Sequence, residues 1–223
     1  NRSGRSGQNK DTYLNIKEVP EVVINVVNYD MVHQMSLASS EYAKGVNEFT
    51  KAGFTQEASK LVKPFRVKES PVQMECKVNQ VIELGTEGGA GNLIICEVVM
   101  MHINEAVLNE KGAIDQSKID LMARMGGNWY CRAHGDAIFE IEKPLTTLGL
   151  GVDSLPEEIR NSKILSGNNL GQLGNVEVLP SADEIAEFKK NNASLSTDEK
   201  HKKAKALLES NHVKEAWLTL LSA

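Results

Sequence analysis

Several kinds of residue and segment are scarce in this sequence, and each shortage excludes a class of protein. Aromatic residues make up only 5% of the 223 residues, which argues against a surface that stacks on nucleic-acid bases or sugars. The three cysteines include no Cys-x-x-Cys pair, so neither a disulfide scaffold nor a four-cysteine zinc site is expected. The longest apolar run, residues 93–103, is interrupted by Glu97 and His102, and it is too short to span a bilayer.

Charge is nearly balanced, with 25 basic and 30 acidic residues and a net charge of −5. Such a chain has no excess of basic residues that would attract nucleic acid or an anionic membrane surface, so we expect neither as a partner. The hydrophobic share of 41% and the charged share of 25% are typical of a folded globular chain. Together with the few cysteines, this composition predicts a cytoplasmic protein.

The sequence begins with Asn1 rather than Met, and residues 2–9 lack the apolar stretch of a signal peptide. These residues have the composition of a loop interior. We therefore expect that the natural polypeptide begins earlier and that an N-terminal part lies outside this sequence.

Three segments have the patterns of β-strands. Residues 22–27 form a β-branched run of strand length, for which we predict burial on both faces. In residues 72–81 apolar and polar side chains alternate, which predicts a buried face and a wet face, with Gln73 and Glu75 on the wet one. The glycine-rich residues 85–91 join this strand to residues 93–103, whose two apolar faces predict the central strand of a sheet or barrel.

Short helices are predicted around these strands. The first spans residues 11–19, with Asp11 or Thr12 as its cap and a proline after its end. The others are predicted over residues 30–43, 55–62 and 117–125, the last of them ended by paired glycines.

The composition changes at residue 143. Glycines punctuate residues 143–180, which we interpret as a loop-rich connection. Two Ser-x-x-Glu patterns, starting at Ser181 and Ser196, then predict capped helices with narrow apolar stripes. The predicted organisation is a β-rich domain over residues 1–142, the connection over 143–180 and a helical extension over 181–223.

Residues 2–12 are the segment with the clearest potential for ligand binding. They combine two arginines, a lysine, hydroxyls and glycines with the start of a helix. The unpaired N–H groups of a helix N-terminus favour anions, and Lys10 and Thr12 add a charge and a hydroxyl, so this segment suits a phosphate group. The alternative is a surface helix that follows a solvated basic loop.

Residues 124–130 are a second candidate, because a Trp and a Tyr stand beside paired glycines. Glycines let a planar ligand or a partner chain approach the backbone, and the aromatic rings can stack there. A helix C-cap followed by a core strand is the alternative interpretation.

Other patterns give no catalytic or metal site. The glycines of residues 85–91 lack the Gly-Lys-Ser/Thr ending of a phosphate loop. Cys131 and His134 make at most half of a metal site, and His102, on an apolar strand, is interpreted as a core residue with one hydrogen-bond partner. No Gly-x-Ser-x-Gly elbow occurs, so no catalytic residue of the chain itself is predicted.

Five segments, in this order, carry a resemblance, and the second of them is the predicted strand over residues 22–27. Residues 10–16 are similar to a K-D-T-x-x-N-I helix, and residues 48–55 to an E-F-x-x-A-G-L-T segment. Residues 69–76 match an E-S-P-V-x-L-E-C strand, and residues 124–130 resemble an R-L-G-G-x-x-Y segment. These are motifs of the flavin reductase-like family, whose domain is an FMN-binding split β-barrel. The resemblance implies a mainly β fold with peripheral helices, to which the helical extension is added.

The family's N-terminal strands, with segments like W-V-S-T and N-x-A-P-F-S, have no counterpart in this sequence. We therefore expect a split barrel that lacks its N-terminal strands here. Residues 143–223 lie outside the resemblance.

The resemblance also implies a cofactor site. Lys10, Asp11 and Thr12 would hold the phosphate and ribityl end of FMN, with Lys10 as the charge, Thr12 as a hydroxyl and Asp11 as the helix cap. Arg2 and Ser3 fall in the loop that approaches this helix.

Arg124 and Tyr130 are implied to reach either the flavin or a second subunit, since barrels of this family typically form homodimers with FMN near the interface.

The implied function is an FMN-dependent oxidoreductase, in which NAD(P)H delivers hydride to the flavin and a small molecule or a protein accepts the electrons. Because the flavin itself accepts the hydride and passes on the electrons, no nucleophile or acid–base pair of the protein is required. Two alternatives stay open: a flavoredoxin-type electron carrier without a nicotinamide pocket, and a flavin-less barrel that serves as a structural or partner-binding module.

Overall fold

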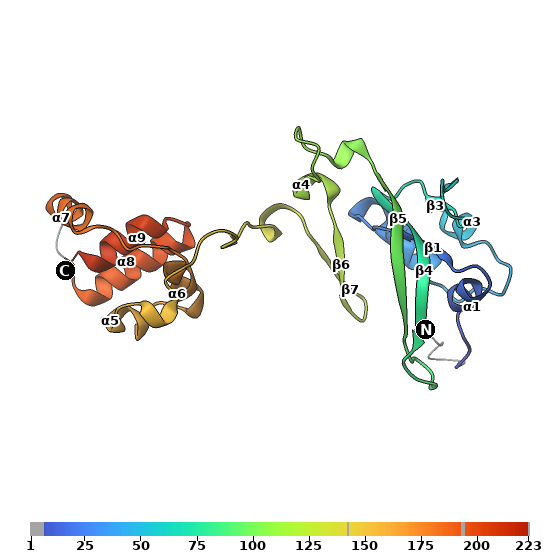
Figure 1. Cartoon of the computed structure of the whole chain (residues 1–223), viewed down its shortest axis with the longest axis horizontal. Helices are drawn as coiled ribbons and strands as arrows, with labels where there is room; N and C mark the ends of the chain where they lie inside the picture. Colours follow the sequence, from blue (N-terminus) through green and yellow to red (C-terminus); the bar gives the residue numbers. More distant parts are fainter. Residues whose placement is uncertain (1–6, 142, 193–194, 223) are drawn as a thin grey trace. The chain divides into compact units, whose positions relative to one another are not determined.

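The computed structural model describes residues 7–141, 143–192 and 195–222. The chain divides into two compact units, residues 1–140 and residues 141–223. All strands of the described residues lie in the first unit (Figure 1). None of the helices in the described ranges is both long and apolar enough to cross a lipid bilayer.

The N-terminal unit is built on a three-stranded antiparallel sheet of β1 (Glu21–Asn25), β4 (Val72–Glu83) and β5 (Asn92–Ile103), in the order β1-β4-β5. The predicted hairpin is confirmed, and β4 and β5 are its two long arms (Figure 1). The predicted central place of β5 is wrong, because among the described strands β5 pairs with β4 alone. Its outer side chains are consequently exposed, Val98 by 48%.

The burial predicted for both faces of residues 22–27 is also wrong. β1 is the other edge of the sheet, and Ile24 is 45% exposed. A β-branched run indicates a strand, but whether both faces of that strand are covered depends on the layers that pack on it.

Short elements surround the sheet. The helices are α1 (Asp11–Glu18), α2 (Val32–Ala38), α3 (Glu48–Ala52) and α4 (Gln116–Ile119), with a 3₁₀ turn at Tyr29–Met31 before α2. Two small antiparallel ladders pair β2 (Gln56–Glu57) with β3 (Arg66–Val67) and β6 (Met122–Gly126) with β7 (Trp129–Arg132). The helix predicted over residues 11–19 is confirmed, and the one predicted over 30–43 is shorter.

Two helix predictions are wrong. Residues 55–62 contain β2 and an irregular segment, because their N–H groups bond to the rest of the unit rather than within a helix. The helix predicted over residues 117–125 stops at Ile119, and β6 follows. Gly126 and Gly127, with φ of 96° and 53°, form the turn of the β6–β7 hairpin instead of a helix C-cap, since positive φ is accessible to glycine at little cost.

The solvent-exposed face predicted for β4 is confirmed at Lys77 and Asn79, which are exposed, but it is wrong at the start of the strand. Gln73 and Glu75 lie under the segment that connects β2 to β3, and Glu75 is 0% exposed. The Glu75 carboxylate accepts hydrogen bonds from the N–H groups of Lys60 (2.8 Å) and Leu61 (2.6 Å). His102 Nε2 lies 2.6 Å from Glu75 Oε1, which confirms His102 as a largely buried residue with a hydrogen-bond partner.

Arg66 completes this polar layer. Its Nη1 donates to Gln73 Oε1 at 2.6 Å, and its Nε lies 3.9 Å from Glu75 Oε1. Gln73 Nε2 in turn donates to the carbonyl groups of Val67 (2.9 Å) and Ser70 (2.8 Å). Buried polar groups are tolerated when each finds partners, so Gln73 and Glu75 at the start of β4 are buried although the alternation places them on the polar face.

The pKa of Glu75 follows from these contacts. Burial by itself raises the pKa, but the two N–H donors and His102 outweigh it and lower the pKa from an ordinary value of 4.5 to about 2.

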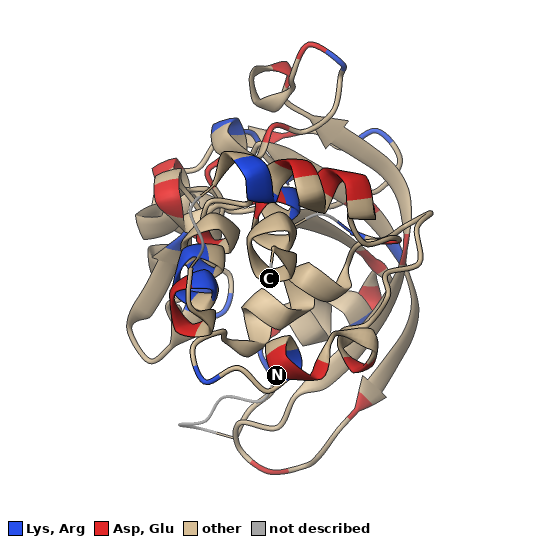
Figure 2. Cartoon of the chain, turned by 90° about the vertical axis from the view of Figure 1, so that its left-hand side faces the viewer, with Lys and Arg blue, Asp and Glu red and all other residues tan. Residues whose placement is uncertain are grey.

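The C-terminal unit is helical. It consists of α5 (Glu157–Arg160), α6 (Gly167–Gly174), α7 (Ala182–Asn191), α8 (Thr197–Glu209) and α9 (Val213–Leu221). The capping boxes predicted at Ser181 and Ser196 are confirmed, and Ser166 with Asn169 forms a third. Both basic and acidic residues lie on the helices of this unit, which faces the viewer in Figure 2.

Residues 143–180 contain long loops, as their glycines predict, but they are more than a connection. They contain α5 and α6 and contribute Leu155, Ile159 and Leu173 to the core around Trp217. A glycine is needed at Gly149, where a Cβ atom would lie 2.5 Å from the carbonyl oxygen of Gly174. Close backbone packing therefore explains part of the glycine content.

Because of this unit, helix accounts for about 38% of the chain and strand for about 22%. The mainly β description fits the N-terminal unit, and the helices are more than peripheral.

Replacing Glu75 tests the polar layer. We expect Glu75→Gln to lower the free energy of unfolding by about 1–3 kcal/mol at pH 7, because two backbone donors lose a buried carboxylate. The ionised carboxylate stabilises the fold above pH 4.5, and this stabilisation is lost as the pH falls toward 2. Urea unfolding should therefore show a gap between wild type and variant that is constant above pH 4.5 and shrinks below it.

Glu87→Gln, in the exposed turn between β4 and β5, is the matched control and should show no such gap. A Glu75→Gln gap that is as large at pH 3 as at pH 7 would contradict the assignment.

Truncation tests the C-terminal unit. Deleting residues 181–223 removes α7, α8 and α9 and uncovers Leu155, Ile159, Leu165 and Leu173. We expect the chain that ends at Pro180 to aggregate or change oligomeric state. A chain that ends at Glu140 lacks the whole unit and therefore exposes none of its core residues. Light scattering would measure the aggregation of both truncated chains. A soluble, monodisperse chain ending at Pro180 would contradict the interpretation that residues 141–223 form one cooperative core.

Candidate functional site

The first candidate is the start of α1. Lys10 is the N-cap residue, in extended conformation, and its carbonyl accepts the N–H groups of Tyr13 (2.9 Å) and Leu14 (3.3 Å). Asp11 is the first helical residue and not the cap predicted for it, because the chain enters the helix one residue earlier. The side chains of Lys10, Asp11 and Thr12 are exposed.

The opposite end of α1 is attached to the sheet. Tyr13 and Ile16 are buried, and the Tyr13 hydroxyl donates to Glu83 at the end of β4. Lys17 lies 3.8 Å from the same carboxylate, with its Nζ 5.3 Å from the centre of the Tyr13 ring. The helix is therefore held by one face and its last turn, which leaves the first turn accessible.

The donor set at the first turn fits a phosphate group. It offers an ammonium group, a hydroxyl and backbone N–H groups that a helix start leaves without intrahelical acceptors. The carboxylate of Asp11 opposes an anion there, so Lys10 and Thr12 are the favourable side chains. Arg2 and Ser3 lie outside the described residues.

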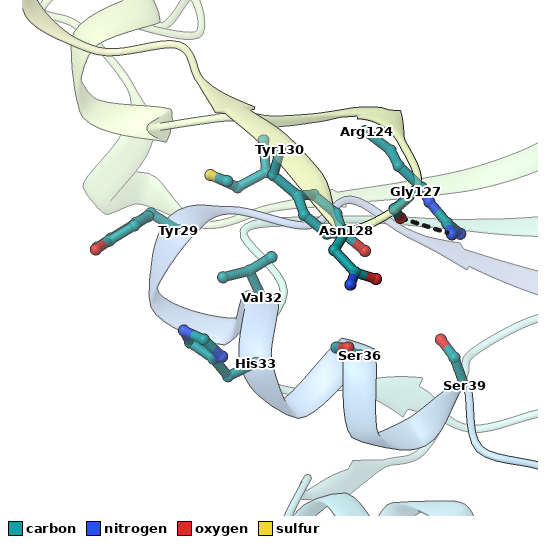
Figure 3. A pocket seen from close by; sticks show the side chains of 10 residues that line it. Tyr29, Val32, His33, Ser36, Ser39, Arg124, Gly127, Asn128 and Tyr130 are labelled. Atoms are coloured by element: carbon teal, nitrogen blue, oxygen red, sulfur yellow. Dashed lines mark hydrogen bonds between the residues drawn. The ribbon is translucent and has the colours of Figure 1, made fainter.

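The second candidate is a pocket of about 480 Å³ between the segment of α2 and the β6–β7 hairpin (Figure 3). Arg124 and Tyr130 lie directly opposite each other in the hairpin and both line the pocket. Lys10, Asp11 and Thr12 are not among its lining residues. The predicted residues thus fall at two places.

Most of the lining was not predicted from the sequence. Gly127 and Asn128 fall within the candidate segment 124–130, and the structure adds Tyr29, Val32, His33, Ser36, Ser39 and Met122. A signal was present, because residues 33, 36 and 39 recur at intervals of three and therefore share one face of a helical segment. Nothing in the sequence indicated which element faces them.

One wall of the pocket is braced by an ion pair. Arg132 donates to Asp120 from Nε (2.8 Å) and Nη2 (2.6 Å), and its guanidinium stacks 3.7 Å from the centre of the Tyr29 ring. The backbone N–H of Tyr29 donates to the carbonyl of Asp120 at 3.0 Å. The hydrogen bond from Arg132 lowers the pKa of Asp120, so the pair stays ionised and Tyr29 has a fixed position.

A second pocket, of about 340 Å³, is mainly apolar. Met31, Phe49 and Phe65 are among its lining residues, and the Oδ1 of Asn25 there already accepts the N–H of Val67 at 3.0 Å. It offers an apolar wall and few groups that would orient a ligand.

The flavin reductase like domain model matches residues 6–120, just over half of the chain. The chain belongs to the flavin reductase-like family. Its solved neighbours include a protein described as having a split barrel domain.

Curated relatives match part of the chain. An uncharacterised protein of Aquifex aeolicus is 31% identical over 132 residues, which cover 59% of this chain and 65% of that protein. One of Methanothermobacter thermautotrophicus is 34% identical over 114 residues, which cover 51% and 54%. The chain thus spans between about half and two thirds of the length of the curated relatives it matches.

Three solved structures are similar to this one. Nitrilotriacetate monooxygenase component B from Bacillus cereus is 28% identical, with a TM-score of 0.55 and coverage of 61% of this chain and 67% of that chain. A putative flavin reductase with a split barrel domain from Shewanella frigidimarina is 26% identical (TM-score 0.52; 60% and 65%). The 2-nitrobenzoate 2-nitroreductase of Pseudomonas fluorescens is 25% identical (TM-score 0.52; 62% and 68%).

Proposed function

We propose that this protein is an FMN-dependent oxidoreductase that uses NAD(P)H and passes electrons to a small molecule or a protein in the cytoplasm. The observation that carries the proposal is the accessible first turn of α1, where a chain of the flavin reductase-like family presents Lys10 and Thr12 beside helix N–H groups. Bound FMN would supply the hydride and electron transfer. The chain would supply the anion site that holds it.

Each group at the first turn has a distinct proposed role. The Lys10 ammonium offsets phosphate charge, the Thr12 hydroxyl donates a hydrogen bond, and the N–H groups of the helix start complete the site. Arg2 and Ser3 are proposed as further phosphate contacts from the sequence alone. Arg124 and Tyr130 line the separate pocket and are not part of this proposed phosphate site.

Flavin binding tests the proposal. The purified protein, supplied with FMN, should show absorbance bands near 370 and 450 nm. We expect Lys10→Ala with Thr12→Ala to weaken FMN binding by about tenfold or more, because charge-assisted hydrogen bonds are each worth about 1.5–3 kcal/mol. Lys17→Ala is the control, since it removes the same charge from the same helix about 10 Å away.

The FMN-loaded protein should then oxidise NADH or NADPH. Flavin binding without this oxidation would make the protein an electron carrier of flavoredoxin type. A protein that binds no FMN at saturating concentration would exclude both and leave a partner-binding module.

We also propose that the protein is a homodimer. The exposed apolar side chains of β5, among them Leu93, Ile95 and Val98, support an association surface, because an apolar patch on a sheet edge is costly to leave in water. Sedimentation equilibrium should give twice the chain mass. A monomer mass at micromolar concentration, with and without FMN, would refute this.

A further inference from the structure

We propose that the pocket between α2 and the β6–β7 hairpin binds a small aromatic carboxylate, with the Arg124 guanidinium holding the carboxylate group. This goes beyond the proposed flavin site, since no residue of the first turn of α1 lines this pocket.

The charge of the pocket favours an anion. Within the described residues Arg124 forms no ion pair, and its one hydrogen bond runs from Nη2 to the carbonyl of Gly127 at 3.4 Å. The ten lining residues include Arg124 and His33 but no Asp or Glu. Arg66 and Arg132 each face a carboxylate within 4 Å, whereas Arg160, like Arg124, bonds to a backbone carbonyl. Arg124 differs from Arg160 in that its guanidinium lines a pocket.

The walls of the pocket favour a ligand whose carboxylate is attached to a planar apolar ring. Tyr29 and Tyr130 flank the pocket from opposite elements, and Val32 and Met122 add apolar surface (Figure 3). Tyr29 is held in place by the Arg132–Asp120 pair, so this wall exists before a ligand arrives. Aromatic side chains bind planar rings by stacking or edge contacts.

The polar groups at the other side suit one carboxylate better than a phosphate. The Ser39 hydroxyl donates to the carbonyl of Met35 at 3.0 Å, so it does not offer its proton to a ligand. His33 and Ser36 line the pocket from α2, together with Tyr29 and Val32 at the start of this helical segment (Figure 3). A single guanidinium matches a single negative charge in a bidentate pair.

The volume agrees with this class of ligand. About 480 Å³ lies within the range of ~300–1,000 Å³ found for small-molecule sites, and it accommodates a substituted benzene ring with its carboxylate.

Calorimetric titration of the whole chain with benzoate, in the absence of flavin, tests the proposal. We expect saturable binding at one site per chain. Benzamide, the neutral isostere, should bind about tenfold more weakly or worse, and Arg124→Gln should reduce benzoate affinity by a similar factor, because each removes the charge-assisted pair. Arg160→Gln, which removes an exposed arginine of the C-terminal unit, is the matched control and should bind benzoate like the wild type.

A second variant blocks the pocket without touching its charge. Ser36→Phe, at an exposed position of α2, should abolish benzoate binding while the unfolding midpoint stays unchanged. Equal affinity for benzamide and benzoate, undiminished binding by Arg124→Gln, or complete displacement of benzoate by stoichiometric inorganic phosphate would each overturn the proposal. None of these results depends on FMN, so failure here leaves the flavin proposal standing.

Discussion

The buried carboxylate of Glu75 is the interaction on which the rest of the N-terminal unit depends. It lies on β4 at 0% exposure, accepts the N–H groups of Lys60 and Leu61, and pairs with His102 on β5. An ionised carboxylate is retained in a protein interior only when several donors compensate for lost water. Here two of the donors come from the segment that connects β2 and β3. The charge can therefore be buried only when this segment packs over the sheet.

The motif that surrounds Glu75 serves the fold rather than a ligand. Glu69 accepts the N–H of Thr55 at 2.9 Å, and the Ser70 hydroxyl lies 2.8 Å from the carbonyl oxygens of Val26 and Val72. Side chains and backbone of this one segment thus join the end of α3, the end of β1 and the start of β4. The two proposed ligand sites lie elsewhere, on exposed or half-buried groups: the first turn of α1 and the pocket beside Arg124. This division lets a rigid polar interior position surface groups whose charges stay uncompensated and available.

Local patterns predicted several elements correctly. The Ser-x-x-Glu boxes at Ser181 and Ser196, the first helix and the β4–β5 hairpin each depend on residues a few positions apart, whose hydrogen bonds form within the element itself. For the same reason the helix start at Lys10 and Thr12, on which the proposed anion site rests, could be predicted from the sequence. The capping residue was misplaced by one position, since Asp11 and Lys10 are both compatible with a helix start.

The sequence by itself therefore determined the hairpin, the capped helices, the family motifs and two clusters of candidate residues. The tertiary structure alone decided that Gln73 and Glu75 face the interior, that β5 is an edge strand among the described residues, and that residues 143–180 belong to a helical core. It also decided that Tyr29 and His33 face Arg124 and Tyr130 across a pocket. The physical reason is the sequence separation of the contacts. A cap or a turn is stabilised by neighbours along the chain, whereas burial and pocket formation depend on which distant segment packs against the element. The alternation of polar and apolar residues does not encode that segment.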